Sequence, residues 1–255
     1  MDRVGTVGAL AHHAALDSSP TLPSSAELAE TSASVWTVFT SPSRAFVGLR
    51  NRPRWFGPLV IAAAASAISQ TWLIQRIGTQ QVIATALRNS GALDTAGAIR
   101  NLTSNTPAVL TGQALASALG CFFAAAVIAC ALWLSAALAG EQVRFKKLIS
   151  VTSLVVFAYS VTRACMIVAT AALASHPERI NIKDPLATSV VYFVNAPSSI
   201  WTPLFGSLDV LSIGAVLLLV QGLTIVGGVS AKRSVFAVTI PWVAYLARGF
   251  VGALL

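Results

Sequence analysis

Long apolar runs alternate with short polar and basic segments after about residue 55. Five runs come close to the roughly 20 residues that cross about 30 Å of hydrocarbon as a helix. They cover about residues 55–74, 111–139, 148–174, 204–227 and 234–255. The pattern predicts an all-α, polytopic membrane protein with five transmembrane helices.

The first 34 residues have no such pattern. They are rich in Ser, Thr, Pro and Ala and show no periodic apolar face, which is typical of disordered segments. We therefore predict a disordered cytoplasmic tail over residues 1–34 and a membrane domain over residues 35–255.

A short helix is predicted between the tail and the first run. Ser41 suits the N-cap, and Pro42 suits the first helical position, where a missing N–H costs least. Phe46 and Leu49 then lie three residues apart on one face. We expect an N-terminal interfacial amphipathic helix whose apolar residues face the acyl boundary.

Composition supports a bilayer location. Apolar residues make up 55% of the chain and charged residues 10%, and the mean hydropathy is +0.74. So few polar residues cannot coat a water-soluble globule of this length.

Lysine and arginine are unevenly distributed among the segments beside the runs. Ten lie in the N-terminal arm and in the second-to-third and fourth-to-fifth connections, against five in the other two, longer connections. Because positive residues are retained on the cytoplasmic side, we predict the N-terminus inside and the C-terminus outside. The isoelectric point near 10.1 then reflects topology, and no nucleic-acid partner is expected.

The N-terminal arm carries candidate lipid-headgroup contacts. Arginines precede the first run and are followed by a tryptophan, an arrangement that places cations at phosphates and the ring at the acyl boundary. These residues are Arg44, Arg50, Arg52, Arg54 and Trp55. The alternative is that the arginines only set topology and have no lipid preference.

Three ionisable residues lie inside the predicted spans: Arg163, Asp209 and Arg248. A charge in hydrocarbon needs a partner or a function. Asp209 and Arg248 lie at depths that differ by only about 3 Å, which allows an ion pair. Arg163 lies deeper and needs carbonyls, Gln113, Gln221 or a share of Asp209. The alternatives are a hydrated path for a polar solute and a misplaced span boundary.

Small residues recur at four-residue spacing in two runs, which lets helix backbones approach closely within the bundle or in a dimer. The rows are Ala62 with Ser66, Ala65 with Ser69, Gly120 with Ala124, and Ala131 with Ser135 and Ala139.

The sequence also predicts structure in the two connections on the outer side. Residues 175–203 form an interfacial or re-entrant segment, and residues 76–110 include a short amphipathic helix.

Residues for catalysis are scarce. The three histidines are His12, His13 and His176, and no HExxH, GxxxxGK[ST] or GxGxxG pattern occurs. Cys121, Cys130 and Cys165 lie in apolar runs without CxxC spacing, as expected of buried packing cysteines. We predict no enzyme activity, no cofactor and no metal.

Two patches resemble a known family. The first comprises Ser41, Pro42, Phe46, Arg52, Pro53, Arg54 and Trp55, and the second is residues 205–243, "FGSLDVLSIGAVLLLVQGLTIVGGVSAKRSVFAVTIPWV". The chain is similar to bacterial proteins with a Yip1 domain over roughly residues 35–255. The resemblance implies five membrane helices and a cytoplasmic N-terminus. Traffic functions of eukaryotic relatives are not carried over, because the middle patterns used there are not evident.

Two function classes remain. The first is a noncatalytic membrane protein that organises lipids or recruits partners. Its expected partners are membrane lipids, other membrane proteins or a second copy of the chain. The second is a small transporter or permease subunit with a polar intramembrane site. A lipid-modifying enzyme that depends on His176 or Asp209 is a distant third.

Overall fold

The computed structural model describes residues 35–89, 105–176, 186 and 209–254. Every regular element in these ranges is helical. The elements are η1 (Thr37–Phe39), α2 (Pro42–Asn51), α3 (Phe56–Ile77), α4 (Thr79–Asn89), α6 (Thr106–Leu138), α7 (Phe145–Leu173), α10 (Val210–Ile225) and α11 (Ala231–Leu254). The predicted all-α class is confirmed for the described part of the chain.

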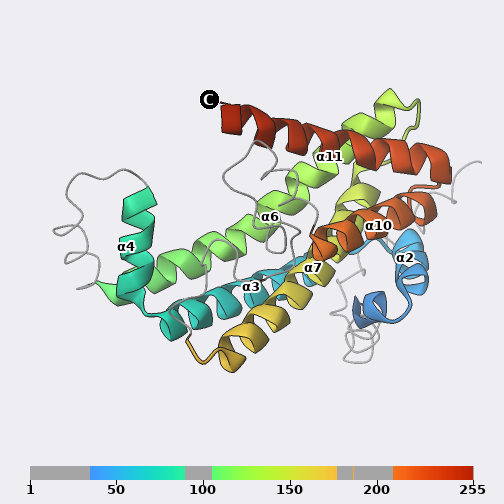
Figure 1. Ribbon diagram of the computed structural model, residues 1–255. Coiled ribbons are helices and arrows are strands. Elements are labelled where there is room, and N and C mark those ends of the chain that lie inside the picture. The colour runs from blue at the N-terminus through green and yellow to red at the C-terminus, as the bar shows by residue number, and fades with distance from the viewer. Residues whose placement is uncertain (1–34, 90–104, 177–185, 187–208, 255) are drawn as a thin grey trace, which may run out of the picture.

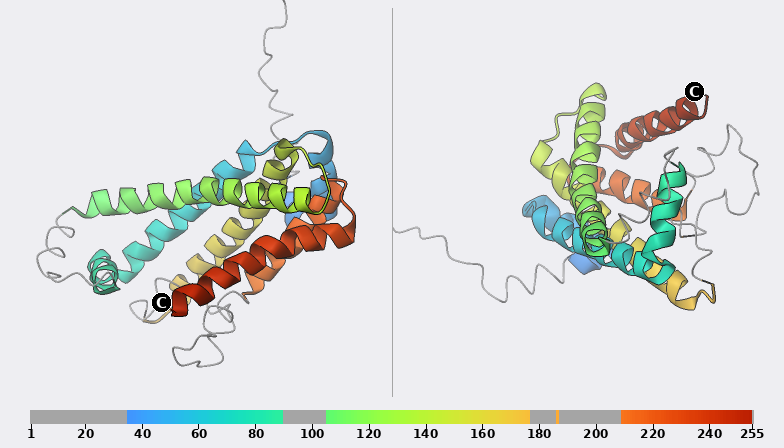
Figure 2. Two further views of the ribbon diagram at one scale, coloured as in Figure 1. Left: turned by 90° about the horizontal axis from the view of Figure 1, so that it is seen from above. Right: turned by 90° about the vertical axis from the view of Figure 1, so that its left-hand side faces the viewer.

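The long helices lie side by side and alternate in direction (Figures 1 and 2). α3 packs against α6 and α7, while α10 packs against α2, α7 and α11. As a result, α2, the α6–α7 turn and the α10–α11 turn meet at one end of the bundle. We call it the basic end, because exposed Lys and Arg residues gather there: Arg44, Arg50, Arg52, Arg54, Arg144, Lys146, Lys232 and Arg233.

Three of the described helices, α3, α6 and α7, are long and apolar enough to cross a membrane. Large apolar side chains are exposed along α6, as expected for a helix that faces lipid; Phe123 at its middle is 73% exposed. α10 is apolar but has 16 residues, or about 24 Å. The predicted start of the fourth run near residue 204 lies outside the described residues, so the fourth and fifth crossings remain predictions.

The turns at the basic end are tight because glycines end two helices. After α6, the Gly140 N–H donates to the Ala137 carbonyl and the Glu141 N–H to the Ala136 carbonyl. This is a Schellman cap, which requires a left-handed residue, and Gly140 has φ +77°. Gly228, between α10 and α11, has φ +75°. Both turns therefore return the chain directly into the next helix.

Small residues line the contacts between α3, α6 and α7, but the two predicted rows on α6 are only partly buried. Gly120 is exposed, with nothing within 4 Å of the place a Cβ would occupy. The buried α6 residues are Cys121, Ala125, Ala129, Leu132, Ser135 and Ala136. A four-residue spacing occurs on several faces of this alanine-rich helix, so spacing alone selected one buried residue, Ser135, together with residues that are partly or fully exposed. On α3, one member of each predicted pair is buried, Ala62 and Ser69, whereas Ser66 and Ala65 are partly exposed.

One cysteine belongs to a polar cluster among the three long helices. The Cys121 thiol donates to Ser66 Oγ at 3.3 Å, and its sulfur lies 3.8 Å from Ser160 Oγ. Cys130 and Cys165 are exposed, so the prediction that all three cysteines are buried is wrong for these two. Both lie on helices, α6 and α7, that are long and apolar enough to cross a membrane.

A second apolar cluster lies at the opposite end of the bundle, between α3 and α7. It contains Leu73, Ile77, Ile167, Ala171 and Leu186, with Val82 of α4 packed against it. α4 confirms the short amphipathic helix expected within residues 76–110. The predicted tail over residues 1–34 lies outside the described residues, as does the predicted interfacial or re-entrant segment after His176, except for Leu186.

Candidate functional site

The most constrained feature at the basic end is the attachment of α2 to the bundle. α2 begins at Pro42 as predicted, although the Ser41 side chain makes no capping hydrogen bond. Phe46 is 0% exposed and belongs to the main core together with Val151 and Leu223. The expectation that Phe46 faces acyl chains is therefore wrong. An amphipathic face can be buried against a bilayer or against protein, and here it is protein.

Gly222 of α10 forms the socket for Phe46. A Cβ built on Gly222 would lie 2.5 Å from Val151 Cγ1 and 2.8 Å from Phe46 Cε1. Both distances are far below normal van der Waals contact, so only glycine leaves room for the phenyl ring. This contact joins three helices: α2, α7 and α10.

A hydrogen bond beside the socket fixes the orientation of α2. Gln221 Nε2 donates to Ser43 Oγ at 2.8 Å. Gln221 was a candidate partner for Arg163 in the sequence, but its described hydrogen bond is to Ser43, and the described partner of Arg163 is Tyr159. The docked helix therefore has one apolar anchor, Phe46, and one polar anchor, Ser43.

Because Phe46 faces inward, the cations of the N-terminal arm face outward. Arg44, Arg50, Arg52 and Arg54 are all exposed. Trp55 is also exposed, and its ring packs edge-on against Phe56 at the start of α3. These five residues were the predicted headgroup contacts, and they lie where the chain passes from α2 into the first long helix.

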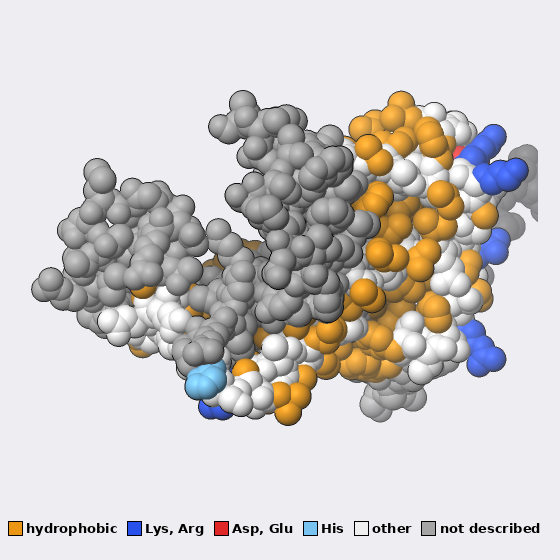
Figure 3. All heavy atoms as spheres, in the orientation of Figure 1, with side chains coloured by type: hydrophobic (Ala, Val, Ile, Leu, Met, Phe, Trp, Pro, Cys, Tyr) orange, Lys and Arg blue, Asp and Glu red, His pale blue; other side chains and the backbone are white. Residues whose placement is uncertain are grey.

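Further cations come from the two turns at the same end. Arg144, Lys146, Lys232 and Arg233 are exposed. Figure 3 shows Lys and Arg side chains along this edge of the molecule, next to a broad hydrophobic face. A band of positive charge bordering an apolar surface is the electrostatic pattern of a protein seated in an anionic leaflet.

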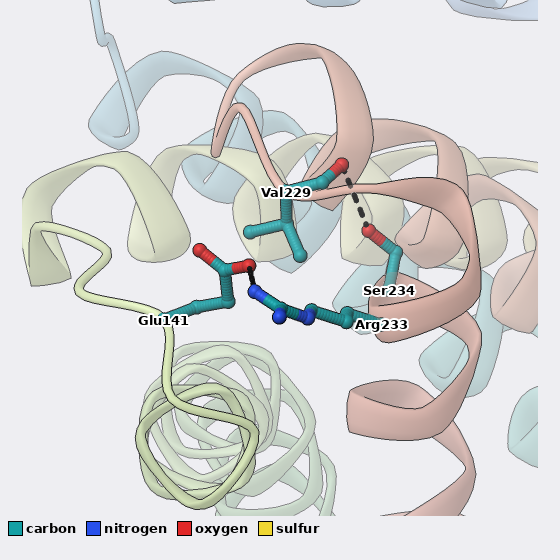
Figure 4. Close-up of polar contacts among 4 residues, drawn as sticks. All are labelled: Glu141, Val229, Arg233 and Ser234. Atoms are coloured by element: carbon teal, nitrogen blue, oxygen red, sulfur yellow. Dashed lines mark hydrogen bonds and ion pairs between the residues drawn. The ribbon is translucent and has the colours of Figure 1, made fainter.

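An ion pair connects the two turns. Arg233 of α11 pairs with Glu141 of the α6–α7 turn, and nearby Ser234 donates to the Val229 carbonyl (Figure 4). Thr224 of α10 also donates to Ser234 Oγ at 3.0 Å. Arg233 is largely exposed, so the pair contributes at most about 1 kcal/mol. It links the α6–α7 turn to the first turn of α11 at the basic end.

The intramembrane candidate Asp209 lies at the N-cap of α10, just before the first helical residue. It is only 8% exposed. Ser212 Oγ donates to Asp209 Oδ2 at 3.3 Å, whereas Oδ1 is buried without a hydrogen-bond partner in the described part of the chain. A buried carboxylate oxygen that lacks a donor is costly.

The other two intramembrane candidates are not joined to Asp209 by any described contact. Arg163 Nη1 donates to Tyr159 Oη, one turn earlier on α7, at 3.5 Å. The side chain of Arg248 lies outside the described residues, so its pairing with Asp209 remains a prediction. No group of three or more His, Cys, Asp or Glu residues that could hold a metal ion occurs within the described ranges.

The sequence drew attention to Phe46 but not to the residues that form its socket. Phe46 was recognised, but its contact with Gly222 was not. Val151 was not singled out, since it is one apolar residue in a long apolar run. The sequence feature that could have indicated the socket was Gly222 itself, a glycine near the end of α10, which is otherwise rich in leucine and valine.

Comparison with known proteins identifies the family. The Yip1 domain matches residues 36–252, a range that includes η1, α2 and the long helices except the last two residues of α11. Neither the curated proteins nor the solved structures gave a match. Since the match covers most of the chain, the protein belongs to the Yip1 domain family.

Proposed function

We propose that the protein is a noncatalytic integral membrane protein that holds anionic lipids at its basic end and recruits partners there. The proposal places it in a bacterial cytoplasmic membrane with the N-terminus inside. Five membrane helices, an interfacial α2 and the headgroup contacts Arg44, Arg50, Arg52, Arg54 and Trp55 are parts of the same proposal. Membrane proteins or a second copy are the proposed partners.

The observation that carries the proposal is the fixed position of α2. A helix held only by lipid could rotate, but Phe46 and Ser43 attach α2 to α10. Arg44 and Arg50 of α2 therefore project from a preorganised surface beside the basic turns, and Arg52 and Arg54 follow directly after the helix. Preorganisation lowers the entropy cost of holding headgroups. This is the feature that distinguishes a lipid-binding surface from cations that only set topology.

Replacing Arg44, Arg50, Arg52 and Arg54 by glutamine should reduce the anionic phospholipid that copurifies with the protein. Each cation near a leaflet contributes about 1 kcal/mol, or about fivefold in binding. Native mass spectrometry of the detergent-solubilised protein would measure the bound lipid. Arg76→Gln, an exposed arginine at the other end of α3, is the matched control. Equal anionic lipid in the quadruple variant and the control would contradict the proposal.

A small transporter or permease subunit is the second candidate, and Asp209 favours it. Its buried oxygen without a described donor could meet a solute or a proton on a hydrated path formed with Arg163 and Arg248. In the leading proposal this region is sealed instead, and Asp209 pairs with Arg248.

Cysteine labelling distinguishes the two functions. We expect Ser212→Cys, beside Asp209, to react with a membrane-impermeant thiol reagent as slowly as Ile213→Cys, which is exposed on an apolar helix. Arg76→Cys is the water-exposed reference, and the native cysteines are replaced by alanine. Reaction at Ser212→Cys as fast as at Arg76→Cys would favour the transporter.

A further inference from the structure

The segment just before α2 turns away from the basic end and meets the middle of α7 (Figure 1). Trp36 packs edge-on against Phe157 with ring centroids 5.2 Å apart, and Phe39 lies 5.7 Å from the same ring. Phe157 is 0% exposed. η1 and its flanking residues therefore cover α7 at this point.

The depth of this contact follows from helix geometry. Lys147 marks the basic end of α7, and Phe157 lies ten residues further along, or about 15 Å at 1.5 Å per residue. Half the thickness of the hydrocarbon core is also about 15 Å. A typical tilt of about 20° shortens the depth by only about 1 Å. A residue that contacts the Phe157 ring thus lies at the level of acyl chains.

The exposed faces of the Trp36 and Phe39 rings indicate what kind of neighbour covers them. Val35 and Val38 are buried against the bundle, whereas Trp36 is 49% and Phe39 44% exposed. Water does not reach this depth beside an apolar helix, so these rings need an apolar neighbour. Acyl chains of the leaflet whose headgroups lie at the basic end are at the right depth.

We propose that residues 35–39 form an aromatic wedge, defined by Trp36 and Phe39, that inserts among acyl chains of the basic-end leaflet. Phe46 and Ser43 hold α2 in place, and α2 in turn holds the wedge against α7. The same segment thus contacts one leaflet at two levels, with arginines at the phosphates and rings among the tails. The inference rests on the membrane placement in the proposed function and adds a specific insertion to it.

Spin-label accessibility tests the wedge. The full chain, with its native cysteines replaced by alanine, carries one nitroxide at Phe39→Cys and is reconstituted in phosphatidylcholine and phosphatidylglycerol vesicles. Because oxygen partitions into hydrocarbon and a nickel chelate into water, the ratio of their collision rates reports depth. We expect a ratio several-fold above that of Arg52→Cys and close to that of Phe123→Cys on α6. Trp36→Cys gives a second, independent position.

Each other outcome overturns a defined part of the inference. A water-like ratio at Phe39→Cys and Trp36→Cys, with a lipid-like ratio at Phe123→Cys, rejects the wedge and leaves the proposed function standing. A water-like ratio at Phe123→Cys rejects the membrane placement itself. Labels shielded from both reagents show that protein covers the rings, either the chain's own N-terminal residues or a second copy, and reject acyl chains as the occupant.

Discussion

Replacing Phe46 by alanine should release α2 from the bundle. The ring is completely buried between α7 and α10, and removing a buried phenylalanine side chain typically costs about 3–5 kcal/mol. A cost of about 3 kcal/mol raises the undocked fraction more than about 100-fold. Trypsin needs α2 to unfold before it cleaves after Arg44 or Arg50, so the cleavage rate should rise by a similar factor.

The neighbouring residue gives a matched control for this prediction. Val47 is 52% exposed on the same helix, so Val47→Ala makes a similar change in helix propensity without opening a cavity. Its cleavage rate should stay within about twofold of the original chain, as expected of surface substitutions. Equal protection of Phe46→Ala and Val47→Ala would show that the ring does not hold α2.

The positions of the helices were largely predictable because bilayer thickness dictates the length of an apolar run. α3, α6 and α7 begin within five residues of the predicted starts, and the Ser41-Pro42 pair correctly predicted the start of α2. Basic residues predicted the shared end of α2 and two turns. These features depend on local composition, which a sequence displays directly.

The contacts that orient those helices were not predictable in the same way. The apolar periodicity of a helix is the same whether its apolar face contacts lipid or protein. The sequence therefore could not show which of the two surrounds Phe46. Nor could spacing choose among the faces of α6, where alanine is frequent. Asp209 was expected inside a span, whereas the described helix begins one residue after it. That difference moves the carboxylate from about five residues inside the predicted span to the N-terminus of the described helix, where negative charge is favourable.

Substituting alanine for Gly222 should displace α2 by filling its socket. The added Cβ would meet Val151 Cγ1 and Phe46 Cε1 well inside contact distance, and overpacking of this kind costs about 1–3 kcal/mol. Gly214→Ala, on the same helix with nothing within 4 Å, should be neutral or slightly stabilising, because alanine favours helix over glycine. Adding Val151→Ala to Gly222→Ala removes the closest atom and should restore part of the protection from trypsin. If Gly222→Ala and Gly214→Ala are cleaved at the same rate, the socket does not exist, and the arginines of α2 have no preorganised position.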